Sequence, residues 1–189
     1  MIEEYGKMAA HILPFEPESK IRVMFMDEAA FGRISDPSRC WAPLGVRPEV
    51  PSQIVREYIQ LYGAVDPYYG DDFYLVMPKC DTEMTNIYLG ELSKQFANDY
   101  ILLGIDNAGW HISKDMVIPE NIRLFYLPAR TPEMNPAEQI WKEIRKIGFK
   151  NKLFQSIDEV VDKLCQVIKS LSPELVKSVT GREWVLSMF

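Results

Sequence analysis

Three acidic residues occupy positions that favour a shared reactive site. Asp27 follows the apolar run IRVMFM, Asp106 follows the apolar run YILLGI, and Glu138 lies in NPAEQIW at the start of a helix-like segment. If the two apolar runs form adjacent parallel strands, both aspartates lie at the sheet edge that usually holds a ligand. Three carboxylates about 4 Å apart would repel by about 4 kcal/mol per pair at an effective dielectric constant of about 20. The pattern therefore predicts a cation among them.

The ligand atoms indicate which cation this is. Carboxylate oxygens favour Mg²⁺ or Mn²⁺ over zinc, and neither His11 nor His111 has a His or Cys partner nearby in the sequence. Two such ions about 3.5–4 Å apart can activate an attacking water or hydroxyl and stabilise the leaving oxygen of a phosphodiester. We therefore expect two Mg²⁺ or Mn²⁺ ions and a phosphoryl-transfer reaction.

Each acid also has an ordinary structural interpretation. An aspartate after a strand often begins a turn, and Asp27 or Asp106 taken alone is more often a turn former than a metal ligand. Glu138, three residues after Asn135, can act as the glutamate of a capping box. Glu133, which precedes the helix, is a weaker alternative for the third ligand. These alternatives stay open at the level of the residues.

Five short β-branched and aromatic runs predict the strands that would position the acids. They cover residues 21–26, 55–65, 72–77, 100–105 and 122–127. A helical pattern over 84–98 predicts a crossover that makes the last two strands parallel neighbours of the first, whereas the early strands form hairpins. Further helices are expected over 2–12 and from Asn135, Ser156 and Ser172 onward. The expected fold class is α/β.

Length and composition favour one domain in a reducing compartment. A chain of 189 residues is long enough to bury a sheet covered by helices on both faces. Its three cysteines, Cys40, Cys80 and Cys165, form no CxxC pair and predict neither a zinc site nor a disulfide framework. No apolar run is long enough for a membrane span, and the first 20 residues do not resemble a signal peptide. We expect a cytoplasmic protein without a membrane partner.

The formal net charge of −6 is unfavourable for a protein that binds nucleic acid, because phosphate contacts normally need a basic surface. Basic residues in two stretches could still form local patches on an acidic body. They are Arg33, Arg39, Arg47, Arg130, Lys142, Arg145, Lys146, Lys150 and Lys152. The alternative is that each of them is ordinary solvated surface.

Three motifs together resemble a known family. The stretches MDEAAF, IDNAGWH and LPARTPEMNPAEQIWKEIR are similar to the catalytic domain of bacterial insertion-sequence transposases of the Tc/mariner superfamily, over roughly residues 20–170. The acids of that family's DDE triad match Asp27, Asp106 and Glu138. The resemblance implies a ribonuclease-H-like fold with a five-stranded mixed sheet, in which parallel additions follow three antiparallel strands. It also implies two Mg²⁺ ions, hydrolytic cleavage at terminal inverted repeats, and attack of the freed 3′-OH on target DNA.

The resemblance also indicates residues around the acids. The segment WAPLGVRP resembles a family region close to DNA, although a tryptophan in an apolar turn is more often buried in packing. Helical geometry places Trp141, Lys142 and Arg145 within about 60° of Glu138, on a face that could hold a phosphate backbone. The candidate DNA-binding residues are Trp41, Arg47, Arg130, Lys142 and Arg145. Residues expected to support the acids without binding metal are Glu28, Asn107 and His111.

Two features differ from the family pattern. Only 31 residues separate Asp106 from Glu138, a few fewer than is usual in the superfamily. Family members also carry helix-turn-helix domains before the catalytic one, and no room for these exists before residue 20. We expect one catalytic domain over 1–189, with a short leading helix over 1–20, a core over 21–150 and terminal helices over 151–189.

The function expected from these features is that of a transposase catalytic domain. Its expected partners are DNA, a second copy of the chain during synapsis and a separate N-terminal DNA-binding polypeptide, all at the bacterial nucleoid. Two alternatives remain. One is another ribonuclease-H-like nuclease, which would cut RNA–DNA hybrids or branched DNA. The other is a non-catalytic remnant or regulator that only associates with DNA.

Overall fold

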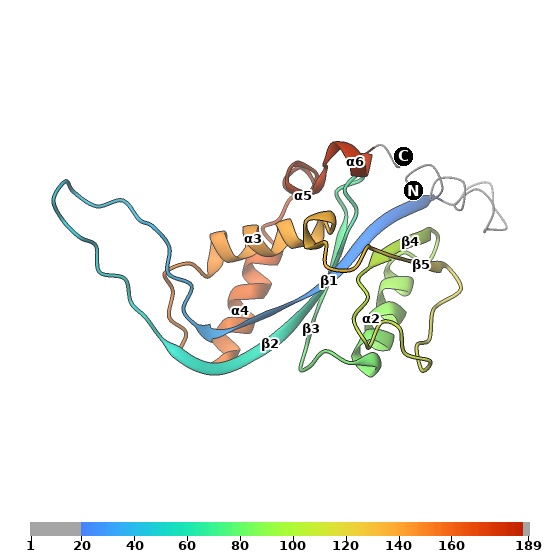
Figure 1. Ribbon diagram of the computed structural model, residues 1–189, viewed down its shortest axis with the longest axis horizontal. Coiled ribbons are helices and arrows are strands. Elements are labelled where there is room, and N and C mark those ends of the chain that lie inside the picture. Colours follow the sequence, from blue (N-terminus) through green and yellow to red (C-terminus); the bar gives the residue numbers. More distant parts are fainter. Residues whose placement is uncertain (1–19, 187–189) are drawn as a thin grey trace.

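The computed structural model describes residues 20–186, except for the side chain of Trp184. Its centre is a five-stranded sheet with the order β3-β2-β1-β4-β5 (Figure 1). The strands are β1 (Ile21–Ile34), β2 (Ile54–Val65), β3 (Asp72–Met77), β4 (Tyr100–Ile105) and β5 (Ile122–Tyr126). The first three strands pair antiparallel, and β4 and β5 are added parallel to β1. The predicted mixed sheet is confirmed, whereas the helix expected over 2–12 lies outside the described residues.

Strand β1 is longer than predicted because its two neighbours end at different places. Parallel β4 pairs with it only from Ile21 to Phe25, whereas antiparallel β2 pairs with it from Phe25 to Ile34. The expectation that the strand ends before Asp27 is wrong. Asp27 lies inside β1, opposite Gly63 of β2, because the ladder with β2 continues where β4 has stopped.

Helices cover both faces of the sheet. They are α2 (Thr82–Gln95), α3 (Ala137–Gly148), α4 (Ile157–Ile168), α5 (Pro173–Thr180), α6 (Glu183–Leu186) and the short 3₁₀ helix η1 (Pro132–Met134). The side chains of Asp81, Ser156 and Ser172 accept hydrogen bonds from the first turns of α2, α4 and α5, which explains where these helices begin.

Alternate residues of β1 contribute their side chains to two separate cores, because successive side chains of a strand point to opposite faces. Phe25 and Phe31 belong to the core that α3, α4 and α5 complete, together with the fully buried Trp141. Met24 and Met26 belong to the core that α2 completes. Residues 27 and 28 therefore face different halves of the molecule.

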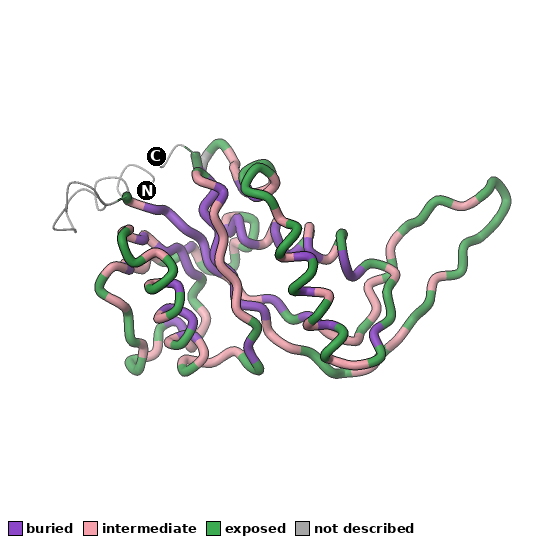
Figure 2. Tube along the Cα trace, turned by 180° about the vertical axis from the view of Figure 1, so that it is seen from behind, coloured by how far each residue is buried: buried purple, intermediate pink, exposed green. Residues whose placement is uncertain are grey.

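The segment between β1 and β2, residues 35–53, extends away from both cores (Figure 2). None of its residues is buried, and the side chains of Trp41 and Leu44 are fully exposed. The alternative that Trp41 is buried in packing is therefore not what the structure shows. No helix within residues 20–186 is long and apolar enough to cross a membrane.

Candidate active site

The register of the parallel pair places two of the predicted acids level with each other. Ile21 pairs with Tyr100, and the register stays constant as far as Phe25 and Gly104. Two residues further along each chain are Asp27 and Asp106. Because strand side chains repeat every two residues, both aspartates continue the face that carries Phe25, toward α3.

Asp27 is held by a residue of the helix that covers it. The indole nitrogen of Trp141 donates a hydrogen bond of 2.8 Å to Oδ2 of Asp27. The pKa of Asp27 is raised to about 7, chiefly by burial and also by the negative charges of Glu138 and Glu28, while the Trp141 hydrogen bond opposes the rise. The site thus makes an ionised Asp27 costly unless a positive charge arrives.

Gly63 explains how a residue as large as tryptophan reaches Asp27. Gly63 is the partner of Asp27 on β2, and a Cβ atom at this position would lie only 2.4 Å from the ring of Trp141. The missing side chain therefore provides the space that the indole occupies. A glycine is required at position 63 because the indole of Trp141 approaches the strand closely, and not because the backbone has a positive φ there.

Glu138 reaches the same region because the start of α3 is attached to β1. The amide of Asn135 donates a 2.9 Å hydrogen bond to the carbonyl of Met26, and its oxygen accepts one from Ala137 N–H. Helix α3 begins at Ala137, one residue later than predicted, and no side-chain hydrogen bond caps it at Pro136. The capping-box interpretation of Glu138 is wrong, because a capping box needs the backbone N–H of Asn135 to donate to Glu138, whereas it donates to the carbonyl of Pro132 at 3.0 Å.

All three acids line one cavity of about 330 Å³. Asn107 and Arg130 also line it, the latter with a left-handed backbone (φ 62°), whereas Glu133 does not. Within residues 20–186, no three His, Cys, Asp or Glu side chains already stand in a metal-binding arrangement. The residues nevertheless fit a hard divalent ion, because the cavity offers three carboxylates and the charges that act most strongly on Asp27 are negative.

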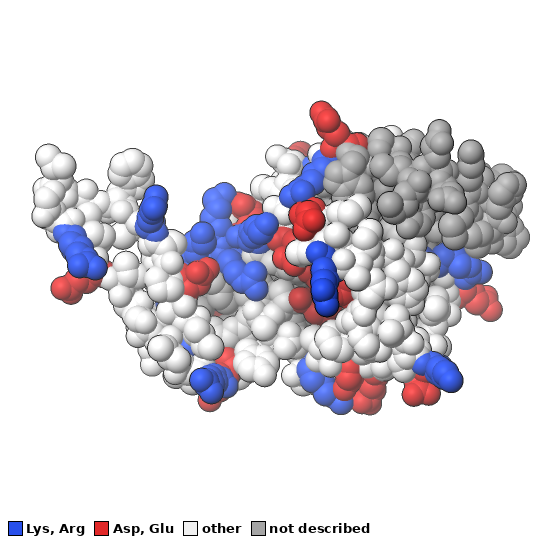
Figure 3. Space-filling view, in the orientation of Figure 1, with Lys and Arg blue, Asp and Glu red and all other residues white. Residues whose placement is uncertain are grey.

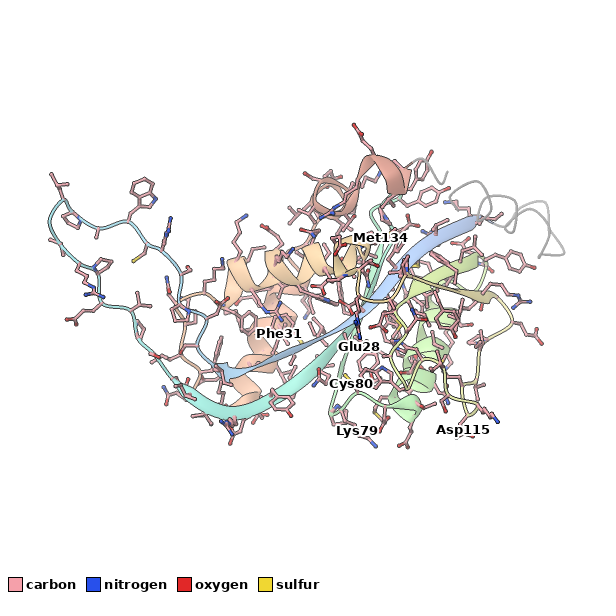
Figure 4. All side chains as sticks on the ribbon, in the orientation of Figure 1. Glu28, Phe31, Lys79, Cys80, Asp115 and Met134 are labelled. Atoms are coloured by element: carbon pink, nitrogen blue, oxygen red, sulfur yellow. The ribbon has the colours of Figure 1, made fainter. Side chains whose placement is uncertain are left out.

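The residues expected to support the acids have different surroundings. The amide of Asn107 donates to the carbonyl of Leu127 at 2.7 Å, so it joins the loops that follow β4 and β5. Glu28 lies in the middle of β1 (Figure 4). It shares the sheet face of Met24 and Met26, so its side chain points to the α2 side, opposite to that of Asp27. The imidazole of His111 lies between Glu28 and Asp106, 2.9 Å from the former and 2.7 Å from the latter.

The candidate DNA-binding residues do not form one surface. Trp41 and Arg47 are exposed on the 35–53 segment, whereas Arg130 lines the cavity. Lys142 and Arg145 lie on α3, over which Lys and Arg side chains gather (Figure 3). The guanidinium of Arg145 lies 4.9 Å from the centre of the Phe31 ring.

Trp141 does not share the exposed helical face on which it was expected. Its side chain is 1% exposed and packs edge-on against Phe31 and Tyr74. Its contact with Asp27 was missed from the sequence, as was the attachment of Asn135 to Met26. The contact of Trp141 could have been predicted from the sequence. A buried indole normally donates to an acceptor, and Trp141 lies one helical turn after Glu138, which places it near the predicted acids.

Comparison with known proteins identifies the family to which this chain belongs. The model of the DDE superfamily endonuclease family matches residues 22–161. An uncharacterized protein of Sinorhizobium fredii, y4pE/y4sA, is 35% identical over 127 residues, which cover 66% of this chain and 94% of that protein. The Tc3 transposase of Caenorhabditis elegans is 27% identical over 173 residues, which cover 84% of this chain and 52% of that protein.

Solved structures of the Mos1 transposase share the fold. The Mos1 paired-end complex with left transposon end has a TM-score of 0.69 at 14% identity, covering 98% of this chain and 59% of that one. The Mos1 paired-end complexes with Mn and with Mg have TM-scores of 0.68 and 0.62 at 13% and 14% identity, each covering 88% of this chain and 53% of that one. The chain thus spans little more than half the length of Tc3 and Mos1. The family model spans most of the described residues, so this chain belongs to the DDE superfamily of endonucleases, and its ribonuclease-H-like fold is similar to that of the Mos1 transposase.

Proposed function

We propose that this domain cuts DNA at the ends of a mobile element and transfers the freed 3′-OH to target DNA, using divalent metal ions. The observation that carries the proposal is the shared cavity of Asp27, Asp106 and Glu138, which come from three distant parts of a chain in the DDE family. Similar Mos1 complexes hold Mn or Mg, and we extend this use of divalent metal to the present chain.

The three acids would hold two Mg²⁺ or Mn²⁺ ions. Such ions make a water or 3′-hydroxyl nucleophilic at neutral pH and neutralise the charge that develops on the leaving oxygen. Trp141 fixes the carboxylate of Asp27, and Asn135 fixes the start of the helix that carries Glu138. These contacts orient the acids before substrate arrives, so that less ordering remains for the reaction itself.

The proposed DNA path runs over α3. Lys142 is exposed, and Arg145 is half-buried two turns after Glu138, so both can pair with phosphates beside the cavity. Arg130, on the cavity wall, is proposed to contact the DNA nearest the reacting bond. The acidic net charge is compatible with this use because the basic residues are local. We also propose that two copies hold two element ends, by extension from the paired-end complexes of Mos1.

The test is metal-dependent nicking of duplex DNA that carries the terminal inverted repeats of the element. Asp27→Asn, Asp106→Asn and Glu138→Gln each keep the shape of the side chain and remove its charge. We expect each to lower the rate of nicking by about 10³-fold, with Mg²⁺ and with Mn²⁺. The matched control is Glu133→Gln, five residues before Glu138 and outside the cavity, which should nick like the wild type.

Three outcomes would contradict the proposal in different ways. Unchanged nicking in the three amide variants would show that these acids are not the catalytic ligands. Preferred cleavage of an RNA–DNA hybrid or a four-way junction over the inverted-repeat duplex would assign the same site to another nuclease activity. Mn²⁺ binding by calorimetry that is equal in wild type and the three variants would favour a non-catalytic role.

A further inference from the structure

A buried imidazole links the cavity to the opposite side of the sheet. The side chain of His111 is 1% exposed, and its Nδ1 lies 2.7 Å from Oδ1 of Asp106. Its Nε2 lies 2.9 Å from Oε1 of Glu28, whose side chain is 7% exposed. Asp106 itself is 54% exposed, so the most accessible of the three groups is the one that reaches the cavity.

The fold holds His111 in this place from several directions. The turn after β4 is closed by hydrogen bonds from Ala108 N to Oδ1 of Asp106 and from His111 N to the carbonyl of Ala108. The hydroxyl of Tyr126, at the end of β5, donates to the carbonyl of His111 at 3.1 Å. The indole of Trp110 donates to the same oxygen of Glu28 that meets His111, at 3.3 Å.

We propose that His111, anchored by Glu28, is a positioning residue for Asp106 and thereby sets the affinity of the site for divalent metal. The inference rests on the function proposed above, because it assigns Asp106 to the metal. A half-exposed aspartate samples several rotamers, and ordering it on metal binding costs free energy. The imidazole contacts Oδ1 of Asp106 before a metal ion binds, so the carboxylate is already oriented and Oδ2 is left for the ion.

The contacts exclude two simpler roles for the same residues. Both ring nitrogens of His111 face carboxylate oxygens, so the ring has no free nitrogen with which to bind a metal ion itself. Glu28 faces the α2 side of β1, and its Oε1 already meets His111 and Trp110. Glu28 therefore acts through His111, which in turn acts through Asp106.

Two substitutions at the same position separate positioning from mere packing. In His111→Asn the amide nitrogen stands about where Nδ1 is, so the contact with Asp106 can survive while that with Glu28 is lost. In His111→Gln the amide reaches the place of Nε2, so the contact with Glu28 can survive while that with Asp106 is lost. Both variants are polar, neutral and smaller than histidine, and a purely structural role predicts no preference for Asn.

The measurement is the affinity of the chain for Mn²⁺ without DNA, by isothermal titration calorimetry, with far-UV circular dichroism to verify the fold. We expect His111→Gln to weaken Mn²⁺ binding by about 10- to 100-fold, as removal of groups that orient metal ligands commonly does. His111→Asn should bind about 10-fold more tightly than the Gln variant. Affinities that are equal in Asn, Gln and wild type, or weaker for Asn than for Gln, would overturn the proposal.

Glu133→Gln is the matched control. It makes the same change as Glu28→Gln at an exposed residue outside the cavity, and it leaves the imidazole and both carboxylates unchanged. Its Mn²⁺ affinity should equal that of the wild type. If His111→Gln does not fold, Glu28→Gln carries the test, because it keeps the ring and removes its anchoring charge. In that variant a wild-type Mn²⁺ affinity would overturn the proposal.

The failure of this inference is distinguishable from the failure of the proposed function. If Asp106→Asn abolishes Mn²⁺ binding while His111→Gln binds like the wild type, the metal site stands and the positioning role is wrong. If Mn²⁺ binding is the same in wild type, Asp27→Asn, Asp106→Asn and Glu138→Gln, the proposed function is wrong, and the role of His111 falls with it.

Discussion

Asp27 and Glu28 are adjacent in the chain, yet their surroundings are opposite in character. Asp27 faces the α3 side, where the side chain that donates a hydrogen bond to it is an uncharged indole and the charges that act on it most strongly are negative. Glu28 faces the α2 side, where it meets His111 and Trp110. The alternation of a strand therefore places an electrostatically unsatisfied carboxylate and a satisfied one on consecutive residues. An unsatisfied carboxylate is suited to take up a cation, and a satisfied one is suited to hold its neighbours in place.

The largest expected effect is on catalysis and distinguishes the two acids directly. Asp27→Asn should lower the rate of metal-dependent nicking by about 10³-fold, since metal ions supply several kcal/mol of transition-state stabilisation. Glu28→Gln should lower it by only about 10-fold, because Glu28 acts through other residues. Single-turnover nicking at a Mn²⁺ concentration near the Kd of the wild type measures both, because a loss of metal affinity is visible there. Equal losses in the two variants would remove the distinction drawn here.

The second effect is on stability, where the two substitutions should have opposite signs. The folded pKa of Asp27, about 7, lies above its ordinary value of 3.8, so folding favours the protonated acid. The associated stability is complete below about pH 4 and is lost as pH rises through about 7. Asp27→Asn should therefore raise the free energy of unfolding at pH 8, by up to about 4 kcal/mol, and change it little at pH 4.

Glu28→Gln should instead destabilise the fold at pH 8, by about 1–3 kcal/mol, because it leaves the imidazole of His111 without its charged acceptor. Urea unfolding of both variants at pH 4 and pH 8, with EDTA present, gives the comparison. A destabilised Asp27→Asn at pH 8 would mean that the buried carboxylate is satisfied after all. Glu133→Gln, on the exposed 3₁₀ turn, serves as the neutral reference.

A smaller effect concerns the indole that donates a hydrogen bond to Asp27. Trp141→Phe keeps an aromatic ring in the core and removes the hydrogen bond that lowers the pKa of Asp27. A hydrogen bond to a charged group contributes about 1.5–3 kcal/mol, so this pKa should rise by about one to two units. The acidic limb of the pH profile of nicking should move upward by the same amount. Tyr74→Phe, which alters a ring packed on Trp141, should leave that limb in place.

The smallest effect tests whether the basic residues over α3 contact phosphate. Lys142→Ala should weaken DNA binding similarly for all sequences and reduce the slope of log affinity against log salt concentration by about 0.9. Lys94→Ala, which removes an exposed lysine of α2 on the other face of the sheet, should leave the slope unchanged. Fluorescence anisotropy over a salt series measures both, and equal slopes would exclude Lys142 from the interface.

The sequence predicts the regular elements well and the connections between them poorly. All five strands are found within one residue of their predicted starts, because each is a compact apolar run with clear boundaries. Strand β1 exceeds its predicted end because residues 27–34 owe their extended form to pairing with β2, which is a tertiary effect. The direction of His111 and the inward turn of Asn135 depend on loop geometry, for which residue spacing carries no signal.

The constant register between β1 and β4 has a consequence for how such chains can vary. A single residue inserted into β4 before Asp106 would turn that carboxylate to the α2 side, and the same change in β1 before Asp27 would exchange the sheet faces to which Asp27 and Glu28 point. We therefore expect insertions and deletions of a single residue to be absent from these two strands in active relatives. Length variation should collect in the stretch between Asp106 and Glu138, where a change in span alters the reach of a loop and not the side on which a ligand stands.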